Sequence, residues 1–143
     1  PDDLELARTL VAHPRWAWRA GMRAVDGRSG TEPLRVTWVA PDCTGYGVDE
    51  HSSEAVGPVL GDYWTEASDV PDLSDPATAG VLLGMLRELP LDSVGAHCSI
   101  AAAHHRRWHV VFPLSDVRFA THYGPTLGAA VARALLAVWE DTP

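Results

Sequence analysis

Nine carboxylates lie between Arg35 and Arg87 with no arginine or lysine among them, and they are the residues best suited to binding chemistry. They are Asp42, Asp49, Glu50, Glu54, Asp62, Glu66, Asp69, Asp72 and Asp75. The rest of the chain is close to neutral, so this stretch supplies the net charge of −8. Its negative field suits a basic partner and repels nucleic acid and anionic membranes. We therefore expect neither direct nucleic-acid binding nor membrane association.

The last carboxylates of this stretch have a local structural explanation. Asp69, Asp72 and Asp75 lie three residues apart, but they lack the ligand order of a calcium-binding loop. Asp75 precedes Pro76 and is suited to cap a helix, and Asp72 is favoured nearby by the helix dipole. The carboxylates that need a functional account therefore run from Asp42 to Asp69. With Trp64 as an aromatic anchor, the predicted partner-binding residues are Asp42, Asp49, Glu50, Glu54, Asp62, Glu66 and Asp69.

A second polar group falls in residues 97–122, which hold five of the seven histidines. If residues 107–112 and 117–122 are neighbouring strands, side-chain alternation places one polar set on a single sheet surface. That set is His105, Arg107, His109, Arg118 and His122. We favour a solvated polar face; the alternatives are an anion-binding face or a zinc site completed by Cys98 or His97. We expect no bound metal and no cofactor.

No catalytic motif accompanies these residues. Cys98 directly follows His97, but neighbours on a strand point to opposite faces, so the imidazole is not placed to activate that thiol. Cys43 lies among carboxylates, which disfavour a reactive thiolate. The sequence contains neither a Gly-x-Ser-x-Gly motif nor a phosphate-binding loop. The pattern favours a protein that is not an enzyme.

Three helices and several short strands are expected to position these residues. Helical spacing and capping signals predict helices over residues 2–12, 76–89 and 126–140. Strands are predicted at residues 22–25, 34–40, 97–102, 107–112 and 117–122. In the second strand, Leu34, Val36 and Trp38 are expected to share one buried face. Residues 41–73 are predicted to be an irregular acidic insert with one short strand within residues 56–64.

This order of elements predicts an α+β fold. We expect a small single domain over residues 1–143, with an antiparallel sheet packed on one face by about three helices. No apolar run reaches the roughly 20 residues needed to cross a bilayer. The acidic N-terminal residues do not suit a signal peptide, and two cysteines do not suit a disulfide scaffold, so a cytoplasmic setting is expected. The oligomeric state stays open.

Three segments resemble those of a group of small uncharacterised phage and prophage proteins. They are the opening His13-Pro14-Arg15-Trp16-Ala17-Trp18-Arg19-Ala20-Gly21-Met22, the helix start Pro71-Asp72-Leu73-Ser74-Asp75-Pro76-Ala77-Thr78-Ala79-Gly80, and Gly124-Pro125-Thr126 before the last helix. The resemblance covers about half of the chain. It implies an accessory protein of a mobile element and offers no catalytic motif to transfer.

Together these observations predict a binding protein whose acidic segment engages a basic surface of a host protein, as an inhibitor or a nucleic-acid mimic. One alternative is a small metal-dependent or histidine-based enzyme that uses the histidines of residues 97–122. Another is a structural subunit of a phage particle or of a homo-oligomer, with tryptophans at its interface.

Overall fold

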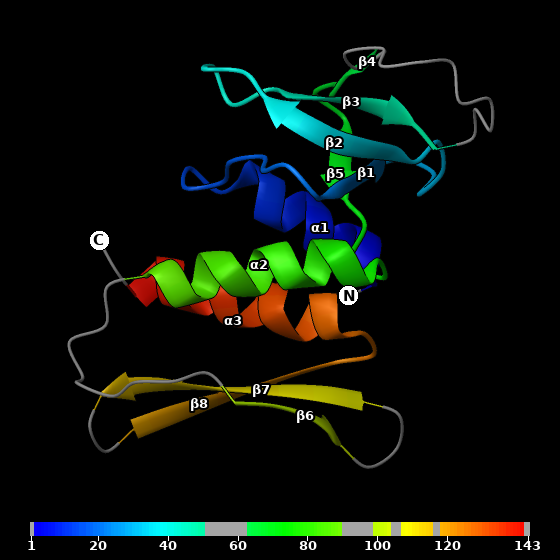
Figure 1. Cartoon of the computed structure of the whole chain (residues 1–143). Helices are drawn as coiled ribbons and strands as arrows, with labels where there is room; N and C mark the ends of the chain where they lie inside the picture. The colour runs from blue at the N-terminus through cyan, green and yellow to red at the C-terminus, as the bar shows by residue number, and fades with distance from the viewer. Residues whose placement is uncertain (1, 51–62, 90–98, 104–106, 116–117, 142–143) are drawn as a thin grey trace.

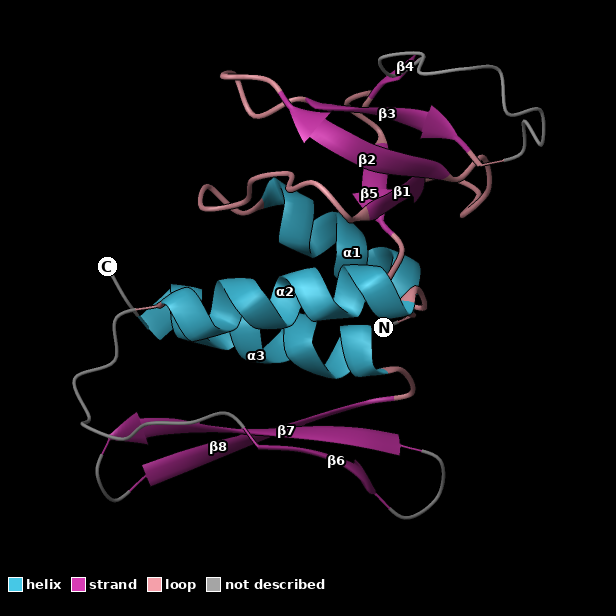
Figure 2. Cartoon of the chain, viewed as in Figure 1, coloured by secondary structure: helices cyan, strands magenta, loops and turns pink. Residues whose placement is uncertain are grey.

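Two antiparallel sheets enclose a layer of three helices (Figure 1, Figure 2). The computed structural model describes residues 2–50, 63–89, 99–103, 107–115 and 118–141. The helices are α1 (Asp3–Ala12), α2 (Pro76–Glu88) and α3 (Leu127–Asp141). The predicted α+β class, with antiparallel strands and three helices, is confirmed, and the strands are divided between two sheets.

The first sheet has five strands in the order β4-β3-β2-β1-β5, and every neighbouring pair is antiparallel. Its strands are β1 (Arg23–Asp26), β2 (Leu34–Val39), β3 (Gly45–Asp49), β4 (Tyr63–Trp64) and β5 (Asp69–Pro71). Three of them lie within residues 41–73, so the predicted irregular insert contributes strands to the sheet. Sequence reasoning missed β3 because Gly45 and Gly47 interrupt its alternating pattern.

The second sheet has three strands in the order β6-β7-β8, again antiparallel. They are β6 (Ser99–Ala103), β7 (Arg107–Ser115) and β8 (Arg118–Gly124), close to the three strands predicted there. α3 packs against β7 and β8, and α1 packs against β5 of the first sheet. Each sheet therefore has a face that the helical layer covers.

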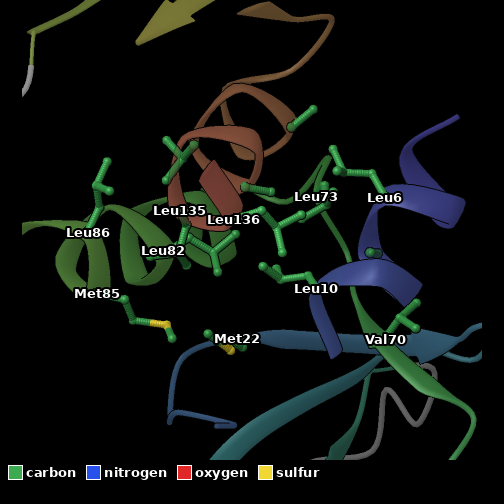
Figure 3. Close-up of a cluster of buried hydrophobic side chains, with 14 of the residues drawn as sticks. Leu6, Leu10, Met22, Val70, Leu73, Leu82, Met85, Leu86, Leu135 and Leu136 are labelled. Carbon is green, nitrogen blue, oxygen red and sulfur yellow. The ribbon is translucent and has the colours of Figure 1, made fainter. Parts of the chain in front are cut away.

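The hydrophobic core lies where the three helices meet the first sheet (Figure 3). Leu10 of α1, Leu82 and Leu86 of α2, Leu135 of α3 and Met22 before β1 have no exposed surface. Burial of an aliphatic side chain of this size contributes about 1.5–3 kcal/mol to folding. This cluster from four segments therefore fixes the helices against the sheet.

The helix starts follow the predicted capping signals. The Asp2 carboxylate accepts a hydrogen bond from Glu5 N at 2.7 Å at the start of α1. Asp75 caps α2 and accepts from Thr78 N at 2.9 Å. The hydroxyl of Thr126 accepts from Ala129 N at 3.1 Å at the start of α3. Each cap satisfies an amide that the first helical turn leaves without a helical partner.

Candidate functional site

A pocket of about 700 Å³ opens at the end of the first sheet where β1, β3, β4 and β5 approach the β1–β2 turn. Its lining includes one cation and five carboxylates: Arg28, Asp26, Glu32, Asp49, Glu66 and Asp69. Trp64 and Leu34 add apolar surface to the wall. We call this the acidic pocket. Its excess of carboxylates gives it a negative potential.

Strand pairing brings two of these carboxylates together. Asp26 of β1 and Asp69 of β5 are direct partners in the antiparallel register. Like charges at such positions repel and destabilise a sheet. Arg28 partly compensates Asp26, with its Nε 3.3 Å from the carboxylate. The backbone N–H and guanidinium of Arg28 lower the pKa of Asp26 below its ordinary value.

Asp69 carries the opposite shift. Burial raises the pKa of its carboxyl group, and the charges of Glu66, Asp26 and Glu32 raise it further. A hydrogen bond from Glu66 N at 2.7 Å lowers it in part. The net shift of the pKa is upward, so keeping this carboxylate charged costs the folded protein stability. A cation in the pocket would relieve that cost.

The turn that presents Glu32 is strained. Glu32 has a φ of 59°, in the left-handed region that non-glycine residues seldom adopt. Such conformations cost of the order of 1–3 kcal/mol and are often found at functional sites. The strain places a carboxylate in the pocket wall instead of the glycine that this backbone would favour.

Three aromatic rings form a cluster that adjoins the acidic pocket through Trp64. Ring centroids are 4.7 Å apart for Tyr46 and Trp64, 6.0 Å for Trp38 and Trp64, and 6.1 Å for Trp38 and Tyr46. Trp38 is 50% exposed and Trp64 is 51% exposed. We call these residues the aromatic patch. Large half-exposed rings in contact with one another are typical of binding surfaces.

A β-bulge creates this patch and overturns the expected position of Trp38. Val36 pairs with Gly47, whereas Trp38 pairs with Tyr46, so the register shifts by one residue between them. Val36 is fully buried, and the extra residue turns Trp38 out of the buried face that it was predicted to share with Leu34 and Val36. The prediction was wrong because a bulge leaves no clear mark in the alternation pattern.

Glu50 was predicted to bind a partner, and the structure assigns it an internal role. Its carboxylate accepts from Arg35 Nε at 2.8 Å and from Arg23 Nη1 at 3.4 Å. Arg23 also binds Asp72 at 2.7 Å, and Arg35 binds Asp75 at 2.7 Å. We call these five residues the arginine network. It neutralises part of the acidic stretch with cations from β1 and β2, which sequence spacing did not reveal.

The other predicted partner-binding residues have different positions. Asp49, Glu66, Asp69 and Trp64 line the acidic pocket. Asp42 is exposed and accepts from Thr44 N at 3.0 Å within its own turn, outside the pocket lining, and this bond lowers its pKa. Glu54 and Asp62 lie outside the described residues.

Sequence reasoning missed Asp26, Arg28 and Glu32, which lie before the acidic stretch. The available signal was the predicted turn at residues 26–30, whose charged residues return to the end of the same sheet. Their place in the pocket depends on the β1–β5 pairing, which joins residues more than 40 positions apart.

His109 and His122 do not share the polar face that was predicted for them. His122 pairs with Val110, which is fully buried, whereas His109 pairs with Tyr123 on the opposite face of the sheet. The prediction assigned the residues of β8 to the wrong faces of the sheet, because His122 lies on the same face as Val110. Burial lowers the pKa of His122, and the nearby charge of Arg133 lowers it further. His105 and the side chains of Arg107 and Arg118 lie outside what the structure describes.

No group of three potential metal ligands among His, Cys, Asp and Glu occurs within the described residues. None of the helices in this part of the chain is long and apolar enough to cross a membrane. No protein-family model, curated protein or solved structure matches the chain.

Proposed function

We propose that this chain is a binding protein whose acidic pocket receives a basic surface of another protein. The observation that carries the proposal is the convergence of five carboxylates and one arginine around a pocket of about 700 Å³. The resemblance to phage and prophage proteins supports a role as an accessory protein, acting in the cytoplasm on a host protein. Inhibition of a nucleic-acid-binding protein by mimicry of its ligand fits this charge pattern.

The charge arrangement favours a cationic ligand over a catalytic role. Asp26 is compensated by Arg28, but Asp69 remains against Glu66 and Glu32 with its pKa raised. A partner's arginine or lysine would supply the missing positive charge and strengthen the interaction with each carboxylate. Among the described residues, His109 and His122 of the histidine-based alternative lie on opposite faces of the second sheet.

Binding of a synthetic peptide of alternating arginine and serine, measured by calorimetry, tests the proposal. The double variant Glu66→Gln/Asp69→Asn removes two pocket charges, and the amide oxygen introduced at position 69 can still accept the hydrogen bond from the backbone N–H of residue 66. We expect about tenfold weaker binding, equivalent to about 1.4 kcal/mol. Wild-type binding should also weaken strongly between about 0.05 M and 0.5 M salt because the Debye length shortens.

A matched control separates the pocket from the overall charge. Asp42→Asn/Glu140→Gln removes the same number of charges at exposed positions outside the pocket. This variant should bind within about twofold of the wild type, as surface charges distant from a ligand are largely screened. Equal losses in the two double variants, or no binding by the wild type at low salt, would overturn the proposal.

A further inference from the structure

We propose that the aromatic patch selects arginine over lysine in the partner segment that enters the acidic pocket. This inference rests on the proposed function and adds the chemistry of the partner. Trp64 belongs to both the pocket wall and the patch, so a bound chain can reach both surfaces at once. One cationic side chain occupies the pocket while a neighbouring one lies on the rings.

The geometry of the rings leaves faces open to a ligand. The ring of Trp38 packs edge-to-face against those of Trp64 and Tyr46, at interplanar angles of 68° and 82°. Half of the surface of Trp38 stays exposed. Trp64 is exposed to the same extent. A planar ring surface next to a negative pocket attracts cations through both the ring quadrupole and the carboxylate charges.

Arginine fits this combination better than lysine. Its guanidinium is planar, weakly hydrated and able to stack on a tryptophan face, while its fork donates two hydrogen bonds to a carboxylate. Lysine presents a strongly hydrated point charge that loses more solvation on an aromatic surface. The carboxylates of the pocket accept either cation, and the arginine fork adds to the preference there. The part of the preference that comes from the aromatic patch is the part that substitution of its tryptophans should remove.

The backbone structure of β2 and β3 fixes the outward orientation of the aromatic patch. The β-bulge turns Trp38 outward, and Thr37 Oγ1 donates to the Tyr46 carbonyl at 3.0 Å across the bulge. Glycines at positions 45 and 47 flank Tyr46 and allow the two strands to approach closely. The rings are therefore positioned before any partner binds, which reduces the ordering cost of association.

The test compares two peptides of equal length and charge, one of alternating arginine and serine and one of alternating lysine and serine. Wild-type protein should bind the arginine peptide about three- to fivefold more tightly, the effect expected of an exposed cation–π contact. Trp38→Ala and Trp64→Ala should each reduce that preference toward one. Trp38→Leu should do the same while keeping apolar volume, which guards against loss of folding.

Tyr123→Ala provides the control, because Tyr123 is 51% exposed but lies in β8 of the other sheet. It should leave the arginine preference unchanged. Equal binding of both peptides by the wild type, with continued sensitivity to Glu66→Gln/Asp69→Asn, would overturn the inference and leave the proposed function standing. No binding of either peptide would overturn both. Loss of preference in Tyr123→Ala would also contradict a specific role for the patch.

Discussion

The Arg35 guanidinium and the Asp75 carboxylate join β2 to the start of α2 through two contacts, at 2.7 Å and 3.2 Å. The same carboxylate caps α2 by accepting from Thr78 N and from the Thr78 hydroxyl. Asp75 is 5% exposed, so its charge depends on these partners for stabilisation. One side chain thus couples a sheet, a helix start and the arginine network.

Replacing Asp75 is expected to destabilise the fold. Asp75→Ala removes the helix cap and leaves Arg35 with Glu50 as its remaining carboxylate partner among the described residues. Loss of a cap costs about 0.5–2 kcal/mol, and breaking a buried ion pair costs about 3–5 kcal/mol. Because Arg35 is partly exposed and keeps Glu50, we expect the free energy of unfolding to fall by about 2–4 kcal/mol in total, as measured by urea unfolding. Asp75→Asn, which keeps a capping oxygen, should lose less than Asp75→Ala.

The stability of the folded state should fall in acid because of Asp75. Burial alone would raise the pKa of its carboxyl group, but hydrogen bonds from Arg35 and Thr78 outweigh burial and lower the pKa from 3.8 to about 2. The resulting stabilisation, about 2 kcal/mol, is present above pH 3.8 and is lost as pH falls toward 2. Urea unfolding from pH 5 to pH 2 measures it, and Asp75→Asn should flatten that part of the profile. An unchanged slope in this variant would contradict the assignment.

Asp69 should show the opposite relation between charge and stability. Its pKa is raised by burial and by neighbouring carboxylates, so the charged form costs stability above the unfolded pKa, and protonation relieves that cost as pH falls through the folded value. Asp69→Asn should stabilise the protein at neutral pH by about 0.5–1 kcal/mol, as substitutions at strained functional sites often do. The same variant should weaken binding of the arginine peptide. Thermal unfolding and calorimetry measure the two effects, and a destabilised variant would contradict this account.

Gly47 should not tolerate a side chain. A Cβ at this position would overlap the carbonyl of Arg35, whose backbone belongs to the paired strand β2. We expect Gly47→Ala to cost about 3 kcal/mol or more, since the strands must separate to admit the methyl group. Gly80→Ala is the matched control: within the described residues, no neighbouring segment comes within 4 Å of the point that its methyl group would occupy, and alanine should stabilise α2 by about 0.5–1 kcal/mol. Similar unfolding midpoints for the two variants would contradict the close approach of β2 and β3.

Local signals made the helices predictable. Asp75 and Pro76 mark the start of α2, and Leu89 before Pro90 marks its end, all within a few residues of the helix itself. The strands of the second sheet were also placed closely. In contrast, β3 and β5 within residues 41–73 were missed, because glycines and short lengths weaken the alternation that identifies a strand, whereas β4 lies at the end of the stretch in which one short strand was predicted.

Only some residues of the candidate site could be identified from the sequence, because the others reach it through long-range contacts. The carboxylates of Asp49, Glu66 and Asp69 were identified from charge density, whereas Asp26 joins them through the pairing of β1 with β5 and Glu32 through the turn between β1 and β2. Glu50 was assigned to a partner because its two arginines are 15 and 27 residues away in sequence. Ion pairs over such separations depend on how the chain folds back on itself. The sequence pattern does not give the distance in space between the charged groups.

The sequence by itself determined the sign and concentration of charge in residues 42–75 and the starts and ends of the helices, because charge counts and capping act through near neighbours. Tertiary structure alone decided which carboxylates are neutralised and which remain open. The fold pairs Glu50, Asp72 and Asp75 with Arg23 and Arg35, and it leaves Asp69 near other carboxylates in the pocket that Trp64 also lines. The reason is physical: electrostatic interactions depend on distance and burial, and both are set by strand register and by a one-residue bulge.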